Sequence, residues 1–161
     1  MSNTTKRIGI IGGSGLYKMD DLQIIDTVEV KTPFGAPSAP FIIGAIPGLD
    51  AELVFLPRHG HGHRLNPSEV PYRANIFGMK SLGVDWIISI SAVGSLREEI
   101  VPGHVVVIDQ FIDRTKNRPS TFFDNGIIAH VAFGDPVCGV LRKMLLGSAT
   151  EAGATVHDGG T

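Results

Sequence analysis

The stretch that decides the fold is Arg7-Ile-Gly-Ile-Ile-Gly-Gly-Ser-Gly-Leu16. Its first half is short, apolar and rich in β-branched residues, which predicts a buried strand over residues 7–11. The strand meets Gly12-Gly-Ser-Gly15 and ends there. A strand that runs into glycines and a hydroxyl residue is typical of a phosphate cradle, because glycine lets backbone N–H groups approach an anion closely.

The spacing of these glycines excludes two familiar nucleotide sites. It is neither the G-x-G-x-x-G of dinucleotide-binding folds nor the G-x-x-x-x-G-K-[ST] of the P-loop. A NAD-dependent oxidoreductase is therefore a weak interpretation of this segment. A simple tight turn at the end of a sheet strand stays open as the alternative, since Gly-rich strand ends recur in α/β folds.

The segments that follow predict further strands at 22–30, 41–46 and 53–56, with a turn-rich loop at 32–37. The links between them are short, so neighbouring strands are expected to run antiparallel. Such early antiparallel pairing argues against a pure Rossmann sheet.

Helices alternate with strands in the rest of the chain. Residues 71–82 predict an amphipathic helix with Tyr72, Ile76 and Met79 on one face and Gly83 as its stop. Buried strands are expected at 86–90 and 105–108.

A second helix is expected after a long loop at 116–135, with Asp135 as N-cap and Pro136 at the first helical position. Val137, Leu141, Met144 and Ala149 would share one face, and Gly153 would close the helix. One more strand is expected to begin at 154–156. Together the elements predict an α/β fold with a mixed central β-sheet flanked by helices. Because no closing helix follows the last strand, the fold is expected to be incomplete at its C-terminus.

Composition excludes several classes of protein. Of the 161 residues, 43% are hydrophobic and 19% charged, and the net charge is −2. This is a globular composition without the basic excess of a nucleic-acid or membrane-surface binder. The single cysteine, Cys138, fits a reducing compartment. No apolar run approaches the ~18 residues of a membrane span, and residues 1–7 lack the apolar core of a signal peptide. A cytoplasmic location is expected.

The segment Pro57-Arg-His-Gly-His-Gly-His-Arg64 carries the densest chemistry. It follows a predicted strand, so Arg58 and His59 are expected at the carboxyl edge of the sheet, where α/β ligands collect. A guanidinium can bind two phosphate oxygens, and the imidazole would add a donor. A metal site at His59, His61 and His63 is an alternative, but no acidic or cysteine ligand accompanies them. A solvated polar loop is the other alternative.

Two later segments are weaker on their own. Ser91-Ala-Val-Gly-Ser95 follows a buried strand and would bring hydroxyl and N–H donors near the first glycine turn if the strands are neighbours, although a plain turn would look the same. The aromatic and charged stretch from Phe111 to Phe123 suits a pocket wall, a subunit contact or an ordinary surface loop. His130 stands alone, and a lone histidine is more often structural than functional.

Taken together, these segments closely resemble the 5′-methylthioadenosine phosphorylase branch of the trimeric purine nucleoside phosphorylases. The resemblance spans roughly Ile8 to Thr161. It rests on motifs that occur in the same order: Gly12-Gly-Ser-Gly-Leu16, Thr32-Pro-Phe-Gly35, Arg58-His59-Gly60, Tyr72-Arg-Ala-Asn-Ile76, Gly94-Ser-Leu-Arg-Glu-Glu-Ile100, Pro102-Gly103 and Asp109-Gln-Phe-Ile-Asp-Arg-Thr115. It implies a purine nucleoside phosphorylase-like fold, of which residues 1–161 would be the N-terminal part of a single domain.

The resemblance also implies an activity and a site. The family cleaves a nucleoside with inorganic phosphate, releasing the purine and a pentose 1-phosphate, without a metal or an organic cofactor. The positions that match its phosphate contacts are Ser14, Arg58, His59, Ser91 and Ala92. Ser14 and Ser91 stand where relatives often carry Thr, and both keep the hydroxyl. His130 matches a position that reaches the alkylthio-ribose pocket of a neighbouring subunit, which implies a homotrimer.

The resemblance also marks what this chain would lack. In the family, the ribose contacts and the carboxylate that assists the leaving purine lie beyond the matched part, so these residues alone are expected to hold the phosphate half of a site and to be inactive. Segments 97–100 and 113–115 favour methylthioadenosine over inosine, guanosine or methylthioinosine as substrate. A non-catalytic phosphate or nucleotide sensor on the same fold is the alternative from another class.

Overall fold

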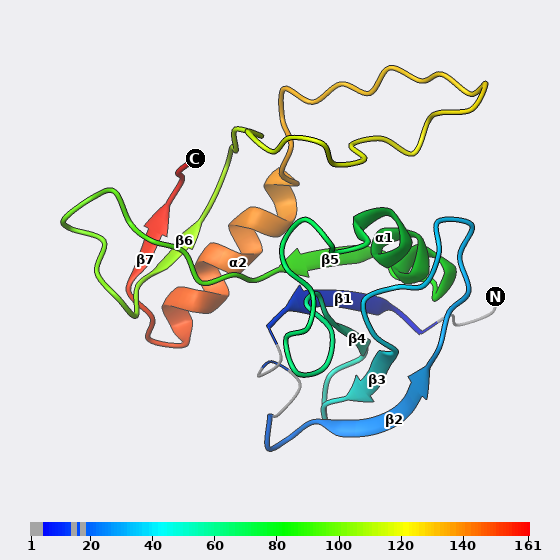
Figure 1. Cartoon of the computed structure of the whole chain (residues 1–161). Helices are drawn as coiled ribbons and strands as arrows, with labels where there is room; N and C mark the ends of the chain where they lie inside the picture. The colour runs from blue at the N-terminus through cyan, green and yellow to red at the C-terminus, as the bar shows by residue number, and fades with distance from the viewer. Residues whose placement is uncertain (1–4, 14–15, 17–18) are drawn as a thin grey trace. The chain divides into compact units, whose positions relative to one another are not determined.

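The computed structural model describes residues 5–13, 16 and 19–161 (Figure 1). The predicted Ser14 contact therefore lies outside the described residues. The chain divides into two compact units, residues 1–92 and 93–161. None of the helices in the described part of the chain is long and apolar enough to cross a lipid bilayer.

The first unit contains a five-stranded sheet that is part parallel and part antiparallel. Strand β3 pairs antiparallel with β2 and with β4, whereas β1 pairs parallel with β4 on one side and with β5 on the other. This arrangement confirms the mixed sheet and the argument against a Rossmann topology. In spatial order the strands are β2 (Gln23–Val28), β3 (Phe41–Ala45), β4 (Glu52–Pro57), β1 (Arg7–Gly12) and β5 (Trp86–Ser89).

Alternation along β3 and β4 builds a core on each face of this sheet. Ile43 lies opposite Val54 and belongs to the larger cluster with Phe41. The neighbouring pair, Ile42 opposite Phe55, belongs to a second cluster. Successive side chains of a strand point to opposite faces of the sheet. A strand in which every residue is apolar therefore supplies apolar side chains to both faces.

Helix α1 (Tyr72–Ser81) packs through a different face from the one that the apolar spacing predicts. Tyr72 and Ile76 are 39% and 38% exposed. The buried residues are Ala74, Asn75, Gly78 and Met79. The prediction was right for Met79 and wrong for the other two, because the helix lies so close to the sheet that a Cβ at Gly78 would come within 2.4 Å of the Phe41 ring. Gly83, with φ +72°, follows the helix as predicted.

A buried polar pair ties α1 to the loop before β3. The Asn75 side-chain carbonyl accepts the Ser38 N–H at 2.8 Å, and the Asn75 amide donates to Ser38 Oγ at 2.9 Å. A Cβ added at Gly60 would lie 3.1 Å from the carbonyl oxygen of Ser38, and Gly60 has φ +73°. The close approach and the left-handed backbone both require glycine there. The Ser38 segment and the loop that follows β4 are therefore closely packed at Gly60.

The second unit holds a parallel pair of strands, β6 (Val105–Val107) and β7 (Val156–Asp158), with helix α2 (Gly139–Glu151) packed against them. Arg142 on α2 donates to the carbonyl of Ile108 and pairs with Asp158. In the loop after β6, hydrogen bonds from the hydroxyl and the N–H of Thr115 lower the pKa of Asp113.

The start of α2 differs from the sequence prediction. The helix begins at Gly139, and Cys138 before it is extended, with φ −64° and ψ 110°. Asp135 and Pro136 therefore do not cap it. Residues 136–140 are Pro, Val, Cys, Gly and Val, all poor helix formers, and good ones begin only at Leu141. Gly153, with φ +80°, follows the helix as predicted.

The packing of Gly78 reverses the usual effect of a helical glycine. We expect Gly78→Ala to destabilise the chain by about 1–3 kcal/mol through overpacking against Phe41. Gly147→Ala in α2 is the matched control. In the described part of the chain, no heavy atom beyond the adjoining residues and the helix backbone lies within 4 Å of a Cβ built there, and alanine should stabilise a helix by about 0.5–1 kcal/mol. Denaturant unfolding followed by circular dichroism measures both changes, and equal gains from both variants would contradict the close packing.

Candidate functional site

Three parallel strands end side by side at one edge of the first sheet. In the register of the sheet, Gly12 of β1 lies beside Pro57 of β4, and Ile11 lies beside Ser89 of β5. The hydrogen bonding of β1 to each neighbouring strand continues one residue beyond the end of that neighbour. The Arg58 N–H donates to the Gly12 carbonyl at 3.1 Å, and the Ile90 N–H donates to the Ile11 carbonyl at 2.9 Å. The residues that follow each strand therefore leave the edge as neighbours.

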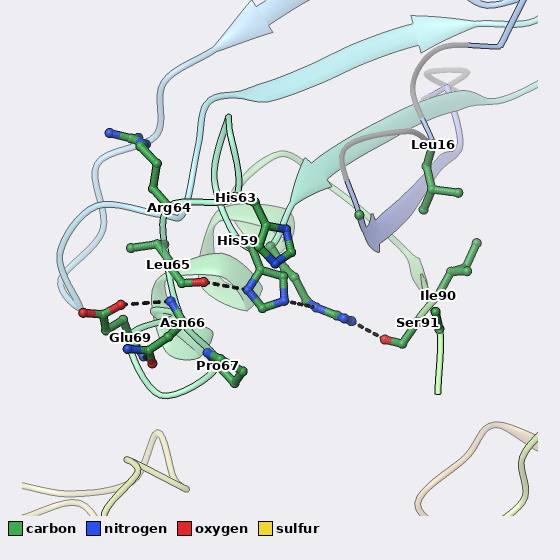
Figure 2. Close-up of a pocket in the computed structure, with 13 residues that line it drawn as sticks. Leu16, His59, His63, Arg64, Leu65, Asn66, Pro67, Glu69, Ile90 and Ser91 are labelled. Atoms are coloured by element: carbon green, nitrogen blue, oxygen red, sulfur yellow. Dashed lines mark hydrogen bonds between the residues drawn. The ribbon is translucent and has the colours of Figure 1, made fainter. Parts of the chain in front are cut away.

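A cleft of about 1020 Å³ opens at this edge (Figure 2). It is lined by residues from the ends of all three strands and from the loop after β4. The four described residues predicted to contact phosphate all line it: Arg58, His59, Ser91 and Ala92. Gly13 of the glycine turn lines it as well. The other lining residues are Leu16, His63, Arg64, Leu65, Asn66, Pro67, Glu69 and Ile90.

The Arg58 guanidinium is anchored at two points. Its Nε–H donates to His59 Nε2 at 2.9 Å, and its Nη1 donates to the Ser91 hydroxyl. These two bonds join the end of β4 to the end of β5 across β1, as the dashed lines of Figure 2 show. Within the described residues, Nη2 makes no hydrogen bond.

His59 is buried, with 9% of its surface exposed, and both ring nitrogens are bonded. Nδ1 lies 2.8 Å from the Leu65 carbonyl. A carbonyl oxygen only accepts, so Nδ1 carries the proton and Nε2 accepts from Arg58. The Leu65 N–H donates to the His59 carbonyl at 3.1 Å, which closes the loop. The His63 ring stacks on the His59 ring with centroids 4.3 Å apart.

Hydrogen bonds and ring stacking arrange the histidines of this loop. Both nitrogens of His59 have partners within the chain, and His63 meets it face to face. In the described ranges, no three histidine, cysteine or acidic side chains come together in a way that could hold a metal ion.

The charge of the cleft suits an anion. Its described lining includes Arg58 and Arg64 as cations, with Glu69 as the carboxylate, and the Arg64 head is turned away from His59 and Ser91 (Figure 2). Glu69 Oε2 accepts the Asn66 N–H at 2.9 Å and so belongs to the turn at the rim. A positive group in a concave site raises the local concentration of anions.

Sequence reasoning missed the loop residues that hold His59. The Leu65 carbonyl and the rim turn at Asn66 and Glu69 have no role in the sequence-based expectations. The Asn66-Pro67 pair was the available signal, because Asn and Pro mark a turn that brings the chain back toward its start. The predicted His130 contact lies in the other unit, where His130 is exposed; its role stays a prediction.

Known proteins resemble this chain over nearly its whole length. The family model described as "Phosphorylase superfamily" matches residues 7–161. An S-methyl-5′-thioadenosine phosphorylase of Geobacter sulfurreducens is 63% identical over 155 residues, which are 96% of this chain and 54% of that protein. One of Thermococcus kodakarensis is 53% identical, covering 96% of this chain and 59% of its own length.

Solved structures of methylthioadenosine phosphorylases are similar to this chain in fold as well as in sequence. The crystal structure of a methylthioadenosine phosphorylase from an Antarctic soil metagenomic library superposes with a TM-score of 0.91 at 46% identity, over 97% of this chain and 55% of that one. The apo enzyme of Schistosoma mansoni gives a TM-score of 0.87 at 38% identity, over 95% and 56% of the two chains. The chain thus spans about half the length of the relatives it matches, and these matches confirm the purine nucleoside phosphorylase-like fold. The chain belongs to the phosphorylase superfamily, as a homologue of the N-terminal part of the methylthioadenosine phosphorylases.

Proposed function

We propose that the cleft binds inorganic phosphate for the phosphorolysis of 5′-methylthioadenosine. The observation that carries the proposal is the position of the Arg58 guanidinium, where three parallel strands end side by side. His59 and Ser91 hold it there by hydrogen bonds, and its Nη2 has no partner among the described residues. Charge-assisted bonds from arginine to phosphate oxygens are among the stronger hydrogen bonds in proteins. The reaction is proposed by analogy with the relatives of Geobacter sulfurreducens and Thermococcus kodakarensis, which are S-methyl-5′-thioadenosine phosphorylases.

In this reaction a phosphate oxygen attacks the anomeric carbon of the sugar. A C–O bond forms, the C–N bond to the purine breaks, and the bonding pair leaves with the base, which takes up a proton. The products are adenine and 5-methylthioribose 1-phosphate. Holding phosphate in line would supply up to about 7–11 kcal/mol through orientation and avoided reorganisation, and its charge would stabilise the cationic sugar in the transition state.

We assign the phosphate half of the site to these 161 residues and treat them as the N-terminal part of a single phosphorylase domain. The chain spans 54–59% of the two curated relatives described above. The groups that read the ribose and the base would then be supplied by residues equivalent to the remainder of those relatives. A purine nucleoside and phosphate are the proposed substrates, and the cytoplasm is the proposed location.

A homotrimer is part of the same proposal. His130 is exposed on a loop that also exposes Ile127, Ile128 and Val131. An exposed histidine among apolar side chains suits a contact with a neighbouring subunit, where it would reach that subunit's alkylthio-ribose pocket. Light scattering of the chain extended as described below measures the oligomeric state.

We expect Arg58→Lys to weaken phosphate binding by about 10- to 100-fold, because lysine cannot reproduce the planar fork that spans His59, Ser91 and the anion. Arg97→Lys is the matched control, since Arg97 is exposed and pairs with Glu99. Calorimetric titration of each 161-residue variant with phosphate measures the change. Equal affinities in all three chains would remove Arg58 from the site.

We expect the 161-residue chain to bind phosphate without releasing adenine from methylthioadenosine. A longer chain can be made by joining, after Thr161, the unmatched C-terminal residues of the Geobacter sulfurreducens relative. We expect this extended chain to release adenine from methylthioadenosine when phosphate is present. Chromatography of the products, with inosine, guanosine and methylthioinosine as competing substrates, gives the specificity. Phosphorolysis by the short chain would contradict the division of the site, and binding without base release by a folded extended chain would favour a sensor.

A further inference from the structure

We propose that Asp109 is a positioning residue: its carboxylate holds the Gly159-Gly160 turn after β7 and so sets the direction in which the chain leaves that strand. The inference rests on the proposed function, in which residues equivalent to the remainder of the relatives supply the groups that read the ribose and the base. Those residues would join the chain directly after this turn. Asp109 itself touches neither substrate on this assignment.

The carboxyl ends of β6 and β7 lie side by side in the second unit (Figure 1). The two strands are parallel, and Val107 lies beside Asp158, the last residue of β7. The Gly159 N–H donates to the Val107 carbonyl at 3.0 Å, so the pairing continues beyond β7. Because α/β folds bind their ligands at the carboxyl edge of parallel strands, the direction of the turn decides what the following residues can reach.

Gly160 is bonded through both of its backbone polar groups. Its N–H donates to Asp109 Oδ1 at 3.1 Å. Its carbonyl accepts the N–H of Asp109 at 3.3 Å and that of Gln110 at 3.4 Å. These two backbone bonds need only an N–H at position 109 and at position 110, whereas the bond from the Gly160 N–H needs the side-chain oxygen of Asp109. Asp109 therefore fixes the peptide plane before Gly160 as well as the plane after it.

The turn fits against the carboxylate because it consists of two glycines. Gly159 has φ +91° and Gly160 has φ +142°, backbone conformations that residues with a side chain disfavour. A Cβ at Gly159 would also lie 3.1 Å from Asp109 Oδ2. The turn and the carboxylate are therefore in close contact, and a change in one is expected to move the other.

Arg142 orients the carboxylate from α2. Its Nη2 lies 4.0 Å from Asp109 Oδ2, its Nε–H donates to the Ile108 carbonyl at 3.2 Å, and its guanidinium also pairs with Asp158. Oδ2 thus faces the cation, and Oδ1 accepts from Gly160. The side chains of Asp109 and Asp158 are 55% and 68% exposed, and ion pairs between exposed groups contribute little to stability. The bond from Gly160 to Oδ1 is therefore the contact whose loss should move the turn.

A small displacement of the turn would matter for the reaction. The residues that follow Thr161 begin two positions beyond Gly160, so they would move with it. A misplacement of about 1 Å in groups that position a substrate can lower a rate about 100-fold. Loss of the Asp109 oxygen should therefore affect the ribose and base half of the reaction. The phosphate cleft is built by the first unit and should keep its affinity.

Three variants of the extended chain separate the Oδ1 bond from the charge. Asp109→Ala removes the bond, and Asp109→Asn keeps an oxygen that can accept the Gly160 N–H. Asp158→Ala is the matched control, because it removes the other carboxylate that pairs with Arg142. We expect Asp109→Ala to lower kcat for phosphorolysis of methylthioadenosine about 10- to 100-fold, with the KM for phosphate within about twofold of the parent. The other two variants should keep kcat within about threefold, because neither removes an acceptor from Gly160.

Three kinetic results would overturn the proposal. The first is an unchanged kcat in Asp109→Ala, or an equal loss in Asp158→Ala, which would assign the effect to Arg142. The second is a loss in Asp109→Asn as large as that in Asp109→Ala, which would assign the effect to the charge. The third is a KM for phosphate that rises in Asp109→Ala in proportion to the fall in kcat, which would indicate damage to the whole fold.

Amide hydrogen exchange in the 161-residue chain, followed by NMR, tests the bond itself and does not depend on activity. We expect the Gly160 N–H to exchange about tenfold faster in Asp109→Ala than in the parent, the loss expected for one hydrogen bond to a charged group. Equal rates in these two chains would overturn the proposal. A Gly160 N–H that exchanges in the parent at the rate of an unstructured glycine would overturn it even if Asp109→Ala did not fold.

These outcomes are distinguishable from failure of the proposed function. No release of adenine by the extended parent chain, together with slow exchange of the Gly160 N–H, would reject the proposed function and keep the bond to Asp109. Release of adenine at equal rates by the extended parent and by its Asp109→Ala variant would keep the function and reject the positioning role.

Discussion

The parallel pairing of β1 with β4 and β5 is the constraint on which the candidate site depends. Parallel strands place their carboxyl ends at the same edge of the sheet, so three separate stretches of sequence arrive together. The ladder extends past the strands through the Arg58 and Ile90 N–H groups, which donate to β1 carbonyls. The side chains of Arg58 and Ser91 meet because the backbone has already brought their strands into register.

Much of this could be predicted from the sequence, because local patterns determine it. The apolar run at residues 7–11, the glycine stop after it and the polar residues after β4 each carry their own signal. Placement of Arg58, His59, Ser91 and Ala92 in one cleft needed only the further step that these strands are neighbours, and the register confirms that step.

The details that sequence reasoning missed depend on tertiary contacts. Which face of α1 is buried is decided by the Phe41 ring, 37 residues before Gly78, and helical periodicity carries no information about it. The proton state of His59 is decided by the carbonyl of Leu65, which any residue type would offer. The late start of α2 is a local effect, since a capping pair at Asp135 and Pro136 was outweighed by weak helix formers after it.

The close packing of Gly60 against Ser38, which Asn75 holds by two hydrogen bonds, limits the substitutions that the loop after β4 can tolerate. At Gly60 a side chain meets two obstacles, the left-handed backbone and the Ser38 carbonyl 3.1 Å from the added Cβ. Removing either obstacle alone leaves the other in place. A shift of the segment around Ser38, which the Asn75 amide holds, would relieve the steric obstacle and leave the strain of the left-handed backbone. Substitutions at Gly60 and Asn75 are therefore expected to be non-additive, because both act on the position of Ser38.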